Sequence, residues 1–374
     1  MRTRTECTVA ILWALIGFWV CVSILARVQI VLYPDTFSGH VYVDEDGHRY
    51  TYDRVVVAPP RASRGDASSA PMKRLRANGV EFDAVCFGGG SLQTVAYLTE
   101  ISALERRIGG SLHTAVRAFA GSSAGALIAI ACAAGMSSLD LGECMVDMSE
   151  ALFAPSIATM WRKYGLDDGT GMDTMLSEKF GQFGIDLDQT IGAFQERYRA
   201  LLYIYAVDAS KRTGVFMPTH CSLRDAIHCS TAIPGIYCPC WFENRLYLDG
   251  SFLNCTLPST LPATHKWLWM RVLSSADGPA FTRDGTIEAY MGTVLSVVRA
   301  PADMHMGDAP HVFACDVPAD ERVPFIVPRM QKSVMRAVRT AAHIRLPSIL
   351  FTCEVANPEQ PEQSEQSETT PARA

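Results

Sequence analysis

A serine flanked by glycines, in Gly121-Ser122-Ser123-Ala124-Gly125, has the GxSxG spacing of a nucleophile elbow. The strand-like residues 115–120 precede this run, and the small apolar residues 124–131 can form a helix after it. The sharp turn between them needs small residues beside the serine, and Gly121 and Gly125 meet that need. The first N–H groups of the helix would favour a negative charge developing at the serine. The run therefore predicts a serine hydrolase with Ser123 as its nucleophile.

Two other segments could supply the base and the oxyanion donors that a serine nucleophile needs. Gly88-Gly89-Gly90 follows a strand pattern at 82–87, and its backbone N–H groups can approach an oxyanion because no side chain blocks them. Asp249-Gly250 follows a strand pattern at 245–248. It places a carboxylate at the C-terminal end of a strand, where α/β sheets form their sites.

Strand and helix patterns alternate from residue 82 onward, which predicts a largely parallel α/β sheet. After the first strand comes a helix with its apolar residues on one side: Val95, Leu98, Ile101, Leu104 and Ile108. The strand and helix of the elbow follow. We expect further buried strands at 201–207, 245–248 and 267–272, and a helix at 172–180.

Taken in this order, the motifs resemble those of the patatin-like phospholipases over roughly residues 82–258, with continuation to about 317. The glycine-rich oxyanion loop of that family corresponds to Gly88, Gly89 and Gly90, and its GxSxG to residues 121–125. Its Asp-Gly-Gly/Ala corresponds to residues 249–251. Two weaker correspondences are Asp208 with residues 213–214, and the SxxxP run at 230–234. The resemblance implies a three-layer α/β/α fold with a mostly parallel central sheet.

The resemblance also implies a Ser-Asp dyad that acts without histidine, metal or cofactor. Ser123 would attack the ester of a phospholipid or another lipid, and Asp249 would take its proton directly. Gly88, Gly89 and Gly90 would form the oxyanion hole, and Gly121, Gly125 and Gly250 would shape the motifs.

This chain departs from the family pattern at two places. The family usually carries Lys or Arg, next to a further Gly, two residues beyond its third loop glycine, where this chain has Leu92 and Gln93. Ser251 stands where the family has Gly or Ala, a small residue that the loop should tolerate.

Two alternatives stay open. One is an α/β-hydrolase triad, with Ser123, an acid at Asp208 or Asp249 and a downstream histidine, because the order Ser, Asp, His would be right. The candidate histidines are His265, His305 and His311. The other is a non-catalytic patatin-like protein that binds lipid or a partner, suggested by the missing basic residue at Leu92.

The composition narrows the classes of partner. The chain has 374 residues, a net charge of −6 and no long basic run, so nucleic acid is not expected as a partner. Its twelve cysteines include no CxxC pair. The densest patch contains His220, Cys221, His228, Cys229, Cys238 and Cys240. We favour buried thiols over a metal site there.

The start of the chain resembles a membrane anchor. Residues 9–26 are uncharged and mostly apolar, and apolar character resumes after Arg27 through Tyr33, which is long enough for one transmembrane helix. Arg2 and Arg4 precede it, whereas only Arg27 follows closely before the acidic residues that begin at Asp35, so the positive-inside rule favours a cytosolic N-terminus. The alternative is a secreted protein whose signal peptide is cleaved after residues 23–26.

The expected organisation follows from these patterns. It comprises a short tail at 1–8, the transmembrane anchor at 9–33, a hairpin and linker at 34–79, the hydrolase domain at 80–317, a C-terminal helical extension at 318–355 and a disordered tail at 356–374. In the extension, basic residues recur every three or four positions from Arg329 to Arg339, as on one face of a helix. The sequence indicates no oligomeric state.

Overall fold

The computed structural model describes residues 73–151, 154–251, 260–273, 312–318 and 345–355, with the short pieces 42–43, 49–50, 335–336 and 339–340. The expected anchor at 9–33 and both expected tails lie outside these residues. Of the helices that are described, none combines the length and the apolar character needed to cross a bilayer.

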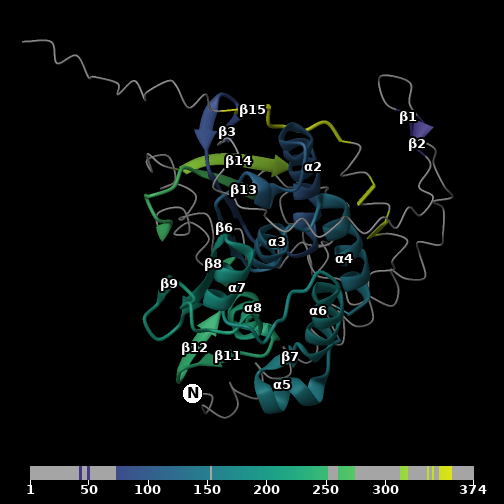
Figure 1. The fold of residues 1–374 in the computed structure, drawn as a ribbon. Helices are drawn as coiled ribbons and strands as arrows, with labels where there is room; N and C mark the ends of the chain where they lie inside the picture. Colours follow the sequence, from purple (N-terminus) through teal and green to yellow (C-terminus); the bar gives the residue numbers. More distant parts are fainter. Residues whose placement is uncertain are drawn as a thin grey trace, which may run out of the picture.

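The central sheet of the described chain has eight strands, in the order β11-β12-β8-β6-β5-β13-β14, with β9 also paired to β8 (Figure 1). Five of them run parallel: β5 (Ala84–Phe87), β6 (Ala118–Ser122), β8 (Leu201–Asp208), β13 (Trp267–Leu273) and β14 (Val312–Pro318). The antiparallel members are β9 (Thr213–Phe216), β11 (Cys240–Phe242) and β12 (Arg245–Leu248). The mostly parallel α/β sheet is therefore confirmed.

The register of the sheet brings the motif residues to one edge. Phe87 of β5 pairs with Gly121 of β6, and Ser122 pairs with Tyr205 of β8. The glycine loop after β5 and the serine after β6 therefore leave the sheet side by side, because parallel strands in register end at the same edge.

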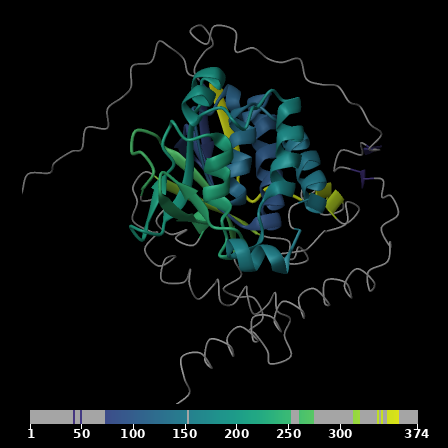
Figure 2. The same ribbon diagram turned by 90° about the horizontal axis from the view of Figure 1, so that it is seen from below.

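Six of the described helices pack on one face of this sheet (Figure 2). They are α2 (Tyr97–Ile108), α3 (Ala124–Ala133), α4 (Ser138–Ala151), α6 (Thr170–Gln182), α7 (Ile191–Tyr198) and α8 (Leu223–Thr231), with the 3₁₀ turns η1 (Ser91–Ala96) and η2 (Leu112–Thr114). Helix α3 is apolar all round and buried from Gly125 to Ala133, as suits a central helix. The opposite face carries a smaller apolar cluster that includes Trp267 and Trp269. A second helical layer, which the three-layer expectation requires, is not among the described residues.

A second, antiparallel sheet joins segments that lie far apart in the sequence. Its strands are β3 (Lys73–Ala77), β4 (Val80–Phe82) and β15 (Phe351–Val355), in the order β15-β3-β4. This corrects the expected organisation, in which 73–77 belong to a linker and 351–355 to a helical extension. The pairing depends on partners about 270 residues apart, and no local pattern reveals them. The expected hairpin is present as β1 (Tyr42–Val43) and β2 (Arg49–Tyr50).

Helix α4 is held to α2 at its first turn. The Ser138 N–H donates to both carboxylate oxygens of Glu105, at 3.1 Å each. Burial is the largest effect on this carboxyl and raises its pKa to about 6, although the bonds from Ser138 oppose the shift. The contact fixes α4, which forms one wall of the pocket described below.

A small unit lies at the end of the domain opposite β15 (Figure 1). It comprises α5 (Ile157–Lys163), β7 (Gly165–Asp167) and β10 (Gly235–Tyr237), with β7 and β10 paired in parallel. Met160, Leu166, Ile233, Ile236 and Tyr237 form its own small apolar cluster.

Candidate active site

Ser123 occupies a strained turn between β6 and α3. Its φ of 55° and ψ of −132° lie where few side chains other than glycine are found. A Cβ at Gly121 would lie 2.2 Å from the Gly125 carbonyl oxygen, and one at Gly125 would lie 2.3 Å from the Phe87 carbonyl oxygen. Both glycines are therefore required by close backbone contacts around the elbow.

The hydroxyl of Ser123 is paired with Asp249. Its Oγ donates to Asp249 Oδ2 at 2.6 Å, and both residues are buried, with exposed fractions of 6% and 1%. The second carboxylate oxygen, Oδ1, accepts the Ser251 N–H at 2.6 Å. The two groups predicted from separate motifs therefore meet in one site, with the carboxylate held on both oxygens.

Asp249 reaches Ser123 by a route that differs from the one expected. Strand β12 runs antiparallel to β8 and pairs only with its last two residues, Tyr247 with Asp208 and Leu248 with Val207. Strand β12 thus begins beyond the C-terminal end of β8 and runs back along it. After Leu248 the chain continues toward Tyr205. A Cβ on Gly250 would lie 2.5 Å from the Tyr205 carbonyl oxygen, which explains the glycine after Asp249.

Ser230 is a site residue that sequence reasoning singled out only as part of a family motif. Its Oγ accepts the backbone N–H of Ser123 at 2.8 Å and donates to the Tyr205 carbonyl at 2.7 Å. It is fully buried near the end of α8. The serine four residues before Pro234 was the signal, but its partner is 107 residues away.

The glycine loop lies against Ser123. A Cβ on Gly89 would lie 2.9 Å from Ser123 Cβ and 1.8 Å from Ser251 Oγ. The amides of Gly89 and Gly90 donate no hydrogen bond within the described part of the chain. The Gly88 N–H, however, donates to the Met270 carbonyl at 2.8 Å. This corrects the expectation that all three glycines offer donors, because Gly88 still belongs to the sheet pairing.

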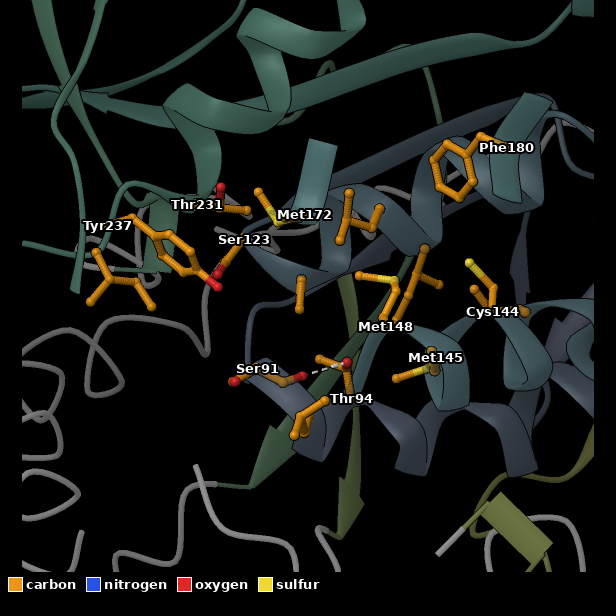
Figure 3. Close-up of a pocket in the computed structure, with 16 residues that line it drawn as sticks. Ser91, Thr94, Ser123, Cys144, Met145, Met148, Met172, Phe180, Thr231 and Tyr237 are labelled. Atoms are coloured by element: carbon orange, nitrogen blue, oxygen red, sulfur yellow. Dashed lines mark hydrogen bonds between the residues drawn. The ribbon is translucent and has the colours of Figure 1, made fainter. Parts of the chain in front are cut away.

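An apolar pocket extends from Ser123 between α4 and α6 (Figure 3). It encloses about 680 Å³, counting the part open to solvent. Ser123, Thr231 and Tyr237 lie at one end in Figure 3, and Cys144 and Phe180 at the other, with Met148 and Met172 between them. Such a lining suits a long apolar group with one polar end.

The pocket is uncharged along its described lining. Burial raises the pKa of the Cys144 thiol to about 12, so the thiol stays neutral. Burial also raises the pKa of the Tyr237 phenol, as do, to a smaller extent, the carboxylates of Asp167 and Asp249. Leu92 is buried and forms part of the wall. The departure from the family pattern at this position thus adds apolar surface to the pocket.

The groups invoked by the triad alternative lie elsewhere. His265 Nδ1 is 3.0 Å from Asp83 Oδ2, beside the first residue of β5 and hence at the sheet edge opposite Ser123. Asp208 closes a turn by accepting the N–H groups of Ser210 and Lys211. His305 and His311 lie outside the described residues.

The cysteine and histidine patch is split into separate contacts. His220 pairs with Glu243, and His228 with Asp173. The Cys229 and Cys240 sulfur atoms are 3.0 Å apart. In the described ranges, no three metal-ligating side chains come together in a group that could hold an ion.

The structure is an α/β protein with a mostly parallel sheet, and its serine on a strained strand-to-helix turn, with a carboxylate at the hydroxyl, has the geometry of a nucleophile elbow. The family model described as Patatin-like phospholipase matches residues 85–259. This part of the chain therefore matches a patatin-like phospholipase domain, whose family comprises lipid acyl hydrolases.

Two solved structures that match this chain are distant from it in sequence. VipD of Legionella pneumophila is 13% identical with a TM-score of 0.36, and the match covers 73% of this chain and 70% of VipD. Full-length ExoU of Pseudomonas aeruginosa, solved with SpcU, is 14% identical with a TM-score of 0.36; the match covers 74% of this chain and 55% of ExoU. The chain thus spans little more than half of ExoU. A comparison with curated protein sequences gives no match.

Proposed function

We propose that this chain hydrolyses acyl esters of phospholipids, with Ser123 as nucleophile and Asp249 as general base. The observation that supports this most directly is the 2.6 Å hydrogen bond from Ser123 Oγ to Asp249 Oδ2 at the end of an apolar pocket. A general base must lie within hydrogen-bond reach of the proton that it removes, and this carboxylate does.

In the first step, Ser123 Oγ attacks the ester carbonyl carbon while its proton passes to Asp249. The oxyanion that forms is stabilised by the amides of Gly89 and Gly90. Cleavage of the ester C–O bond leaves the acyl group on Ser123, and the departing alkoxide takes the proton from Asp249. Water then attacks the acyl-enzyme and gives one proton to Asp249, which returns it to Ser123 Oγ as the fatty acid leaves. These reaction steps use no metal or cofactor.

The pocket supports an acyl chain as the group that is bound. A chain that enters beside Ser123 would contact Met148 and Met172 and extend toward Phe180 (Figure 3). The absence of charge along the described lining favours a hydrocarbon over a headgroup in this space.

We further infer that residues 9–33 anchor the chain in a membrane as one span, with the N-terminus in the cytosol. The apolar length of this segment and the two arginines before it support the inference. An anchor would keep the domain close to its lipid substrate.

The test is phospholipid hydrolysis in detergent mixed micelles by the full chain and its variants. Ser123→Ala and Asp249→Asn should each lower the rate by about 10²-fold or more. Ser177→Ala, an exposed serine of α6, is the matched control and should be unaffected. Wild type should be labelled at Ser123 by a fluorophosphonate and should keep its rate in EDTA.

Three outcomes would contradict the proposal: activity that survives in Ser123→Ala, activity that chelator abolishes, or a folded wild type that neither turns over lipid nor reacts with the probe. The last would favour the non-catalytic alternative. His265→Ala, His305→Ala and His311→Ala should each stay active, because the dyad needs no histidine.

A further inference from the structure

Helix α5 exposes an apolar surface that nothing described covers. Ile157 and Trp161 are each 55% exposed, and Tyr164, the residue that ends the helix, is 75% exposed. Ile157 and Trp161 are four residues apart and so share one helix face, and Tyr164 follows one turn later. Large exposed apolar side chains that gather in one place mark a contact surface.

This surface is attached to the pocket. Met160 of α5 packs against the buried pair Leu166 and Ile236, and Ile233 and Tyr237 pack against the same pair. Ile233 and Tyr237 also line the pocket, and Tyr237 lies at the end where Ser123 lies (Figure 3). Helix α5 is therefore joined to the pocket through this cluster, because Ile233 and Tyr237 belong to both.

The charged residues of α5 itself are basic, and one of them is paired with a carboxylate. Arg162 and Lys163 lie in its last turn. Lys163 Nζ is 2.9 Å from Asp168 Oδ2, and the carboxylate raises the pKa of the ammonium. Arg162 has no carboxylate partner within the described part of the chain. A net positive edge beside Trp and Tyr side chains is the composition that binds at the headgroup region of a bilayer.

The size of this exposed surface also favours a lipid bilayer over a protein as the binding partner. Three side chains of one short helix expose far less than the roughly 800 Å² that each partner buries in a stable protein interface. A few aromatic and aliphatic side chains suffice for a lipid surface, because each inserts independently.

We propose that Ile157, Trp161 and Tyr164 form a lipid-docking surface that inserts into an anionic bilayer and presents the pocket entrance to it. This rests on the proposed function in one respect, namely that the substrate lies in that bilayer. With α5 inserted, an acyl chain passes from the lipid to the pocket beside Ile233 and Tyr237 with little exposure to water.

The first test measures docking without catalysis. The full chain carrying Ser123→Ala is studied by amide hydrogen exchange with and without vesicles of phosphatidylcholine and phosphatidylserine. Residues 157–164 should exchange several-fold more slowly with vesicles, and 351–355, at the opposite end of the domain, should not change (Figure 1). Equal exchange of 157–164 in both conditions overturns the proposal.

The second test separates docking from chemistry. Trp161→Ala should lower hydrolysis of phospholipid in anionic mixed micelles by about tenfold, the value of one large apolar side chain, and leave a short-chain, water-soluble ester unaffected. Leu350→Ala is the control, since Leu350 is 64% exposed next to β15. Unchanged micellar activity, or equal loss on both substrates, overturns the proposal. If wild type hydrolyses neither ester, the proposed function fails, and hydrogen exchange alone decides on docking.

Discussion

The hydroxyl of Ser230 accepts the backbone N–H of Ser123 at 2.8 Å. The amide of the nucleophile is therefore used to hold the strained turn, and it is not free to bind an oxyanion. In the proposed mechanism the donors therefore come from the glycine loop, where Gly89 and Gly90 have amides without partners in the described structure. Helix α8 thus positions Ser123 through Ser230, and in the proposed mechanism the loop after β5 binds the oxyanion.

Ser230→Ala should therefore affect the Ser123 hydroxyl indirectly, through the backbone of the turn. It leaves the Ser123 N–H buried without a partner, which costs about 1–3 kcal/mol of unfolding free energy. Because the turn then shifts, we expect kcat to fall about tenfold or more, with little change in KM. Ser230→Thr keeps a hydroxyl and should recover part of the activity. Steady-state kinetics and thermal unfolding check this; a stable, fully active Ser230→Ala would contradict it.

Gly89→Ala should abolish turnover. The new methyl group would lie 1.8 Å from Ser251 Oγ and 2.9 Å from Ser123 Cβ, so the loop must move away from the nucleophile. Loss of oxyanion donors costs about 10²–10³-fold in kcat. The control is Gly181→Ala in α6, where nothing lies within 4 Å; it should be active and slightly more stable. Equal activity of the two variants would refute the proposed role of the loop.

Ser251→Ala should stabilise the protein without loss of activity. The Ser251 hydroxyl is buried and has no hydrogen-bond partner in the described structure. An unpaired buried hydroxyl costs about 1–3 kcal/mol, so its removal should raise the unfolding free energy. Denaturant titration measures the change. A drop in kcat without a change in stability would instead assign this hydroxyl to the reaction.

Cys229 and Cys240 should form a disulfide when the folded protein meets a small oxidant disulfide such as oxidised glutathione. Their sulfur atoms are 3.0 Å apart, and the pKa of Cys240 lies below its ordinary value because Cys229 donates to it and because His228 is near. Closing this short loop should add up to about 3 kcal/mol. Mass spectrometry should find the linked peptides, and the melting temperature should rise by several degrees. Cys229→Ser should show neither effect; linkage of other pairs instead would contradict the geometry.

Glu105 should make stability depend on pH. Its pKa is raised from 4.5 to about 6, chiefly by burial, so the folded protein holds the proton more tightly than the unfolded chain. The unfolding free energy should therefore fall as pH rises through this window, by at most about 2 kcal/mol. Glu105→Gln keeps an acceptor for Ser138 and should be more stable than wild type at pH 7, but not at pH 4. Denaturation at both values checks this, and a pH-independent difference would contradict it.

Much of the fold followed from local patterns. The strands expected at 201–207, 245–248 and 267–272 match β8, β12 and β13 within one residue, because each is a short, mostly apolar run. The helix expected at 172–180 lies within α6. The strand expected at 82–87 is divided at Asp83, since β4 belongs to the small sheet and β5 to the central one. Sequence patterns locate strands, but they do not assign strands to sheets.

The groups proposed to do the chemistry lie in short sequence motifs. The sequence by itself therefore determined the candidate nucleophile, its carboxylate partner and the glycines that allow other backbone atoms to approach closely. Those properties depend on residue type and on neighbours along the chain. The tertiary structure alone decided that Gly88 pairs with Met270, that Ser230 holds the Ser123 amide and that Met160 of α5 packs in one cluster with Ile236. Each of these joins groups distant in sequence, and such contacts are fixed by packing and register, which no single segment encodes.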